Sequence, residues 1–65
     1  MPFNSTEAKK HMPNLTLHQA LKWAMLANDE EARLLKIGGT PNDCKLKATQ
    51  HACMKMKVLM RRTGL

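Results

Sequence analysis

The chain has very few of the residue types that build β-sheets. Val58 and Ile37 are its single valine and single isoleucine, and its aromatic residues are one Phe and one Trp, with no Tyr. Sheets are enriched in β-branched and aromatic residues. The apolar residues present are mainly Leu, Ala and Met, which are strong helix formers. The sequence therefore predicts an all-α fold, a small helical bundle.

A length of 65 residues allows one domain with a thin core. A chain of this size buries only about 60% of its unfolded surface on folding. Such chains commonly gain stability from disulfides, metals or self-association, so a homodimer is one hypothesis. Apolar residues make up 43% and charged residues 25% of the sequence, which is typical of a globular protein. We expect residues 1–65 to form a single helical domain.

Pro13 and the Gly38–Pro41 run are the main breaks in the helical pattern. Before Pro13, we expect the N-terminal segment (residues 1–15) to be weakly ordered, because terminal segments fray. It has the pattern of a short helix of two turns that ends near Met12. Asn4 or Ser5 would cap that helix.

A clearer helix signal follows at residues 16–37. Thr16 is a good N-cap, and Gln19 three residues later completes a capping box. On a helical wheel, seven apolar residues fall in one arc of about 200°. They are Leu17, Ala20, Leu21, Trp23, Ala24, Met25 and Ala27. The remaining side of the wheel holds His18, Gln19 and Lys22, with Leu26 as its single apolar residue.

The phase of this helix fails beyond Ala27, since Glu31 would enter the apolar arc and Ile37 would leave it. Asn28 followed by Glu31 also reads as a second capping box. We therefore expect a kink or break near Asn28, with one unbroken helix over 17–37 as the alternative. Gly38 is predicted to end this segment in the left-handed conformation, and residues 38–40 to form a loop.

The last helix is predicted over residues 41–62. Thr40 as N-cap, Pro41 at the first helical position and Asp43 in the first turn favour this start. We expect this helix to pack antiparallel on 17–37 as a helical hairpin. Its predicted apolar arc contains Leu46, Ala48, Thr49, Ala52, Cys53, Met56, Leu59 and Met60.

The other side of the last helix is basic. Residues 43–65 contain six basic residues and one acidic residue, so they carry +5 of the net charge of +6. No acidic residue within the face can pair with these cations, whereas a face that only keeps a protein soluble usually mixes signs. A solvated face is the alternative. The predicted partner-binding residues are Lys47, His51, Met54, Lys55, Lys57, Val58, Arg61 and Arg62.

This face predicts a noncatalytic, regulatory protein that binds an anionic macromolecule. DNA or RNA ranks first, because Lys and Arg at this spacing could neutralise about 3–5 phosphates. The alternative is a protein-protein interaction module, an inhibitor or adaptor that docks on an acidic groove of a larger protein. Met54 and Val58 would then be the apolar anchors.

Other chemistries find little support in the sequence. Cys44, His51 and Cys53 lack the spacing of a zinc site, so no metal or other cofactor is expected. We expect Cys53 to be a core residue and Cys44 a half-exposed thiol. About 13 Å of helix would separate the two, which excludes a disulfide. Free thiols favour a reducing compartment, the cytoplasm.

The sequence also argues against several functional classes. There is no glycine-rich phosphate loop and little room for a substrate cleft, so we expect no enzymatic activity. No segment resembles a signal peptide or a membrane span. Trp23 is predicted to be a partly buried core residue.

Overall fold

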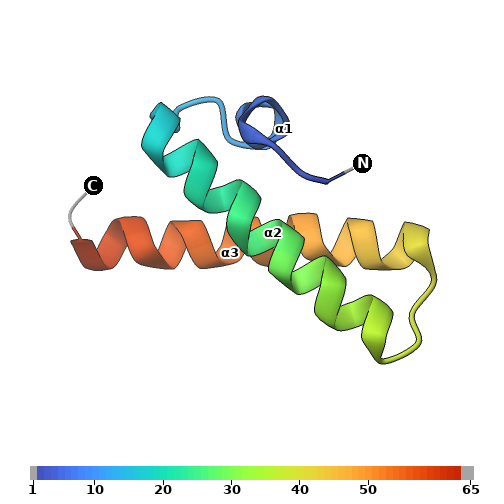
Figure 1. The fold of residues 1–65 in the computed structure, drawn as a ribbon. Coiled ribbons are helices and arrows are strands. Elements are labelled where there is room, and N and C mark those ends of the chain that lie inside the picture. The colour runs from blue at the N-terminus through green and yellow to red at the C-terminus, as the bar shows by residue number, and fades with distance from the viewer. Residues whose placement is uncertain (1, 64–65) are drawn as a thin grey trace.

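The computed structural model describes residues 2–63, which form three helices (Figure 1). They are α1 (Ser5–His11), α2 (Leu17–Lys36) and α3 (Pro41–Thr63). The described residues contain no strand, so the all-α prediction is confirmed, as is the short N-terminal helix. The central helix α2 contacts both α1 and α3.

The helices begin where the capping residues predict. The side chain of Asn4 accepts a hydrogen bond from the backbone N–H of Glu7 (2.9 Å) at the start of α1. At the start of α2, the hydroxyl of Thr16 accepts from the N–H of Gln19 (3.2 Å). The side chain of Gln19 accepts in return from the N–H of Thr16 (2.9 Å), which confirms the capping box. These side chains satisfy backbone donors that the first helical turn leaves without partners.

The turn between α2 and α3 depends on Gly38. Its φ of +97° lies in the left-handed region, which glycine adopts without a steric cost. The N–H of Gly38 donates to the carbonyl of Leu35 (3.1 Å), and the N–H of Gly39 donates to that of Leu34 (3.2 Å). This pair of bonds is the Schellman arrangement, and it ends α2 as predicted.

The break predicted near Asn28 does not occur, and the alternative of one unbroken helix is confirmed, because α2 is continuous over Leu17–Lys36. The prediction failed because it centred the buried arc of the helical wheel too close to the side of α2 that is exposed in the structure. The residues that α2 buries include Trp23, Glu30 and Leu34, which share one phase along its whole length. Because the buried residues keep this phase beyond residue 27, the helix continues without a break.

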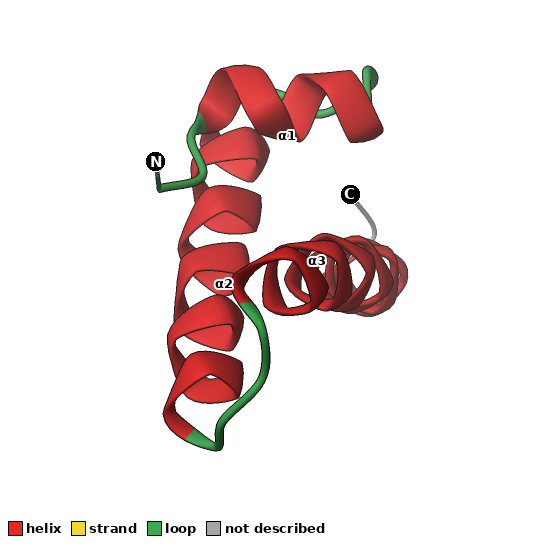
Figure 2. Ribbon diagram, turned by 90° about the vertical axis from the view of Figure 1, so that its right-hand side faces the viewer, coloured by secondary structure: helices red, strands yellow, loops and turns green. Residues whose placement is uncertain are grey.

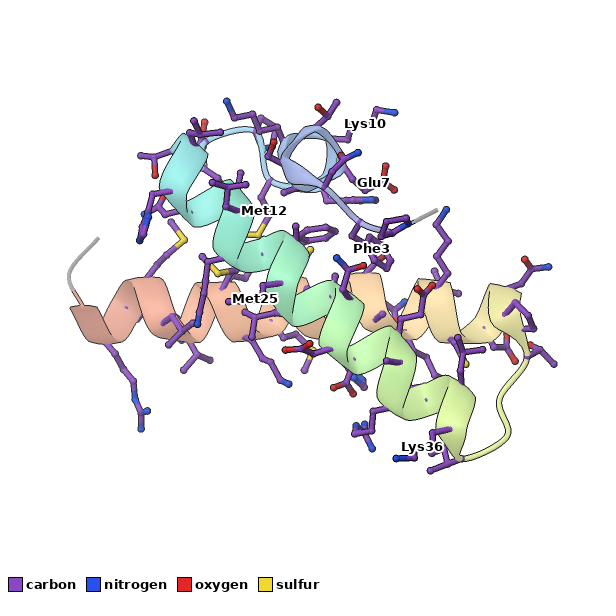
Figure 3. All side chains as sticks on the ribbon, in the orientation of Figure 1. Phe3, Glu7, Lys10, Met12, Met25 and Lys36 are labelled. Atoms are coloured by element: carbon purple, nitrogen blue, oxygen red, sulfur yellow. The ribbon has the colours of Figure 1, made fainter. Side chains whose placement is uncertain are left out.

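Asn28 anchors the N-terminal segment instead of starting a new helix. Its side-chain oxygen accepts a hydrogen bond from the N–H of Phe3 (2.8 Å), and its side-chain nitrogen donates to the Phe3 carbonyl (3.0 Å). Figure 3 shows Phe3 between α1 and α2. The predicted cap is therefore a long-range clamp between two segments 25 residues apart.

Trp23 is the centre of the core and is fully buried rather than partly buried. The ring of Phe3 meets it edge-on, with 5.5 Å between centroids, and the ring of His11 stacks on it at 5.7 Å. The Trp23 indole N–H donates to the sulfur of Cys53 on α3 (3.4 Å). The buried core cluster comprises Phe3, Ala8, Leu15, Ala20, Trp23, Ala24, Ala27, Ala48, Ala52 and Met56.

The two long helices run in opposite directions, as predicted for a hairpin, but they cross obliquely (Figure 1). Small residues at the buried faces, such as Ala27 and Ala52, permit close approach of the helices. Figure 2 shows that α1 and α3 both lie on the same side of α2. The opposite side of α2 is therefore left uncovered by the other helices.

The predicted apolar arcs were too wide or misplaced. On α2, three of the seven predicted core residues are exposed: Leu17, Leu21 and Met25. They are exposed because α1 and α3 cover only part of the arc (Figure 2). On α3, Leu46 is exposed and Cys44 is buried, since the buried face is turned toward Cys44 relative to the prediction.

Candidate partner-binding site

The eight predicted partner-binding residues lie on one half of the circumference of α3. Their spacing of three, four and seven residues in a continuous helix places them on neighbouring positions. Seven of them are exposed, and His51 is half-buried. The exposed ones are Lys47, Met54, Lys55, Lys57, Val58, Arg61 and Arg62.

Two apolar side chains lie exposed among these cations. Met54 is 61% exposed and Val58 is 49% exposed. Both line a shallow groove of about 470 Å³ where α3 crosses α2. We call it the α2–α3 groove; its lining residues are Lys22, Leu26, Met54, Lys55, Val58 and Leu59. The groove therefore combines a mainly apolar surface with two lysines, one from each helix.

A buried carboxylate lies between the two helices beside this groove. Glu30 of α2 is only 7% exposed, and three cationic or polar side chains surround it. Arg33 forms an ion pair and hydrogen bonds with it along the same helix. From α3, the Nδ1 of His51 lies 2.8 Å and the Nζ of Lys55 lies 3.5 Å from its oxygens. Glu30 thus fixes the position of α3 relative to α2.

These contacts lower the pKa of Glu30 from 4.5 to about 2. The hydrogen bond from Arg33 is the largest cause, followed by the one from His51, while the charge of Lys55 adds a smaller effect in the same direction. Burial alone would raise the pKa. The same contact raises the pKa of Arg33. Glu30 is therefore ionised at neutral pH and holds Lys55 at the edge of the groove.

The cations of the basic face consequently fall into two groups. His51 and Lys55 are engaged by Glu30, whereas within residues 2–63 no carboxylate pairs with the four other cations of the site. Those four are Lys47, Lys57, Arg61 and Arg62. The unpaired cations are the ones that an anionic partner could engage without breaking a contact within the protein.

Glu30, Lys22 and Leu26 were not identified as site residues from the sequence, and Leu59 of the groove was assigned to the core. Glu30 was missed because its partners on α3 are 21 and 25 residues away. Lys22 and Leu26 were assigned to the polar side of α2, yet both line the groove. The signal that could have found the groove was Leu26, an apolar residue on an otherwise polar side.

The two cysteines are free, and Cys44 was predicted wrongly as half-exposed. It is 1% exposed because Gly39 lies directly against it. A Cβ at position 39 would be only 2.7 Å from the Cys44 sulfur. This close approach favours glycine at position 39, and burial removes Cys44 from contact with solvent.

Within the described part of the chain, no three His, Cys, Asp or Glu side chains are grouped to bind a metal ion. None of the helices in residues 2–63 is long and apolar enough to cross a membrane. No protein-family model, curated protein or solved structure matches the chain. Its function is therefore inferred from the chemistry and geometry of the site.

Proposed function

We propose that this chain is a small noncatalytic binding protein, an inhibitor or adaptor, whose basic face docks on an acidic surface of a larger protein. The observation that carries the proposal is the exposure of Met54 and Val58 at the centre of a ring of cations. These two side chains continue into the α2–α3 groove. An apolar centre with a charged rim is the usual organisation of a protein-protein interface.

The α2–α3 groove and the cations would have different roles in such a complex. Met54 and Val58 would be anchors, because a few fully desolvated side chains near the centre of an interface supply most of the binding energy. Methionine suits this role, since its flexible thioether adapts to the partner's shape. Arg61 and Arg62 would pair with carboxylates at the rim, where charge mainly sets specificity and the rate of association.

Nucleic acid is the second candidate, favoured by the four unpaired cations of α3. Four phosphate contacts would give salt-dependent affinity with little sequence preference. The exposed Met54 and Val58 favour a protein, because phosphates offer these side chains no apolar surface. The engagement of Lys55 by Glu30 also reduces the number of cations available for phosphates.

Affinity capture from lysate with matched variants distinguishes the two candidates. The wild-type chain is compared with Met54→Glu and with Leu46→Glu, each with and without nuclease treatment. Leu46 is a matched control, since it lies on the same helix and is 59% exposed, but does not line the groove. We expect one stoichiometric protein to survive nuclease, to be retained by Leu46→Glu and to be depleted at least tenfold by Met54→Glu.

The captured protein is then purified and titrated with each variant. We expect Val58→Ala to weaken binding by about 1–2 kcal/mol, at least as much as Arg61→Ala. Loss of every captured partner on nuclease treatment, together with a log affinity for duplex DNA or RNA that falls linearly with log salt, would refute the protein proposal. That result would support nucleic acid instead.

A further inference from the structure

The face of α2 that α1 and α3 leave uncovered carries an apolar row, interrupted between Met25 and Ala32 by Asn28, whose side chain holds the backbone of Phe3. Leu17, Leu21, Met25 and Leu35 are 60%, 55%, 52% and 44% exposed, and Ala32 between them is also exposed. Their spacing places them along one side of the helix. The row runs from Leu17 to Leu35, a length of about 27 Å at the rise of an α-helix.

The row lies outside the buried phase of α2, which includes Trp23 and Leu34, and α1 and α3 lie together on one side of this helix (Figure 2). It is therefore a different surface from the unpaired cations of α3. Contiguous exposed apolar patches on small proteins commonly mark an interaction site. A chain of this length buries only a limited share of its surface on folding, so covering such a row would add to its stability.

We infer that this row is the interface of a two-fold homodimer in which α2 packs antiparallel on α2 of a second copy. A two-fold axis midway along the row places Leu17 of one copy beside Leu35 of the other. The same axis places Met25 beside its own symmetry mate. The row thus matches itself end to end, as a symmetric interface requires.

The charges beside the row fit the same arrangement. Asp29 and Lys22 lie on the same flank of the row, three residues beyond and four residues before its midpoint. In the antiparallel pair, Asp29 of one copy therefore lies opposite Lys22 of the other, to within about one residue rise. Both side chains are exposed, and neither has an ion-pair partner within residues 2–63. The two-fold axis creates two such pairs.

A second copy is favoured over an acidic partner on this face. The acidic residue of the flank, Asp29, is balanced by Lys22 of the same flank, so the row is self-complementary rather than uniformly basic. Lys22 also lines the α2–α3 groove, so this flank of the row borders the proposed partner site. Met54 and Val58 lie on α3 and are not part of the row.

Sedimentation equilibrium of the full chain over a range of concentrations tests the inference. We expect a reversible dimer, with the dissociation constant raised at least tenfold by Leu21→Glu and by Met25→Lys. The matched control is again Leu46→Glu, for which we expect an unchanged constant. Far-UV circular dichroism verifies that each variant keeps its helices. A wild-type chain that stays monomeric over the range, or a dimer that Leu21→Glu leaves intact, would overturn the inference.

Charge reversal tests the antiparallel arrangement itself. Asp29→Lys and Lys22→Asp should each weaken the dimer severalfold, because each places like charges opposite one another. The double variant restores opposite charges and should return the dissociation constant to near the wild-type value. A double variant as weak as the worse single variant would exclude this pairing. Capture of the protein partner by Leu21→Glu is measured in parallel, so that failure of the dimer and failure of the proposed function are distinguished.

Discussion

Replacing Glu30 with glutamine removes the charge that joins α2 to α3 while keeping the size of the side chain. We expect Glu30→Gln to lower the free energy of unfolding by about 2 kcal/mol at pH 7. A pKa lowered from 4.5 to about 2 corresponds to roughly 3 kcal/mol of stabilisation of the carboxylate. Arg33 and Lys55 are exposed, so solvent screening reduces this value.

The pH dependence of this difference follows from the sign of the shift. Because folding lowers the pKa of Glu30, its contribution is complete above the unfolded value of 4.5 and disappears as the pH falls through about 2. The contribution of the Glu30 charge to the difference in unfolding free energy between wild type and Glu30→Gln should therefore be fully present above pH 4.5. It should then shrink steadily between pH 4.5 and pH 2. Subtracting the variant cancels the contributions that the two proteins share.

Urea denaturation followed by far-UV circular dichroism measures both free energies at each pH and at one protein concentration. Glu31→Gln is the matched control, since Glu31 is half-buried on the same helix and has no ion pair within residues 2–63. We expect its effect to stay within about 0.5 kcal/mol. Equal effects of the two substitutions at pH 7, or a Glu30→Gln difference that persists unchanged at pH 2, would refute the role assigned to Glu30.

Three further substitutions test the fold. Asn28→Ala should cost about 1–3 kcal/mol in the free energy of unfolding, because the backbone N–H and carbonyl of Phe3 lose their partners; unchanged hydrogen exchange at Phe3 would contradict the clamp. Gly39→Ala should cost about 1–3 kcal/mol by crowding the Cys44 sulfur. The same change in a Cys44→Ala background should cost less, and equal costs in thermal unfolding would argue against the crowding. Thr16→Ala should cost about 1 kcal/mol through loss of the α2 cap, whereas a neutral effect in urea denaturation would show that the capping box contributes nothing.

The helix limits were predictable because capping is local. Asn4, Thr16 and Gly38 each act within a few residues, so their roles can be read from neighbouring sequence. Asn28 shows the limit of such reasoning, since its local pattern is that of a cap while its actual partner is the backbone of Phe3. Local pattern alone cannot decide between a cap and a long-range contact for the same side chain.

The buried faces were harder to predict than the helices. A helical wheel shows which residues are apolar, but the crossing of α2 and α3 decides which part of a wide apolar arc is covered. On α2 the covered part contains Trp23, and the uncovered part contains Leu21 and Met25. The composition of the basic face was readable from α3 alone. The α2–α3 groove was not readable from α3 alone, because two of its six lining residues, Lys22 and Leu26, come from α2.

The single tryptophan provides an internal probe of how the three helices come apart. Trp23 contacts Phe3 and His11 from the N-terminal part of the chain, and Cys53 from α3. Its fluorescence therefore responds to separation of α1 from α2 even while most helical content persists. If α1 detaches first, the fluorescence transition will precede the loss of helical circular dichroism, and the two curves will coincide if unfolding is two-state.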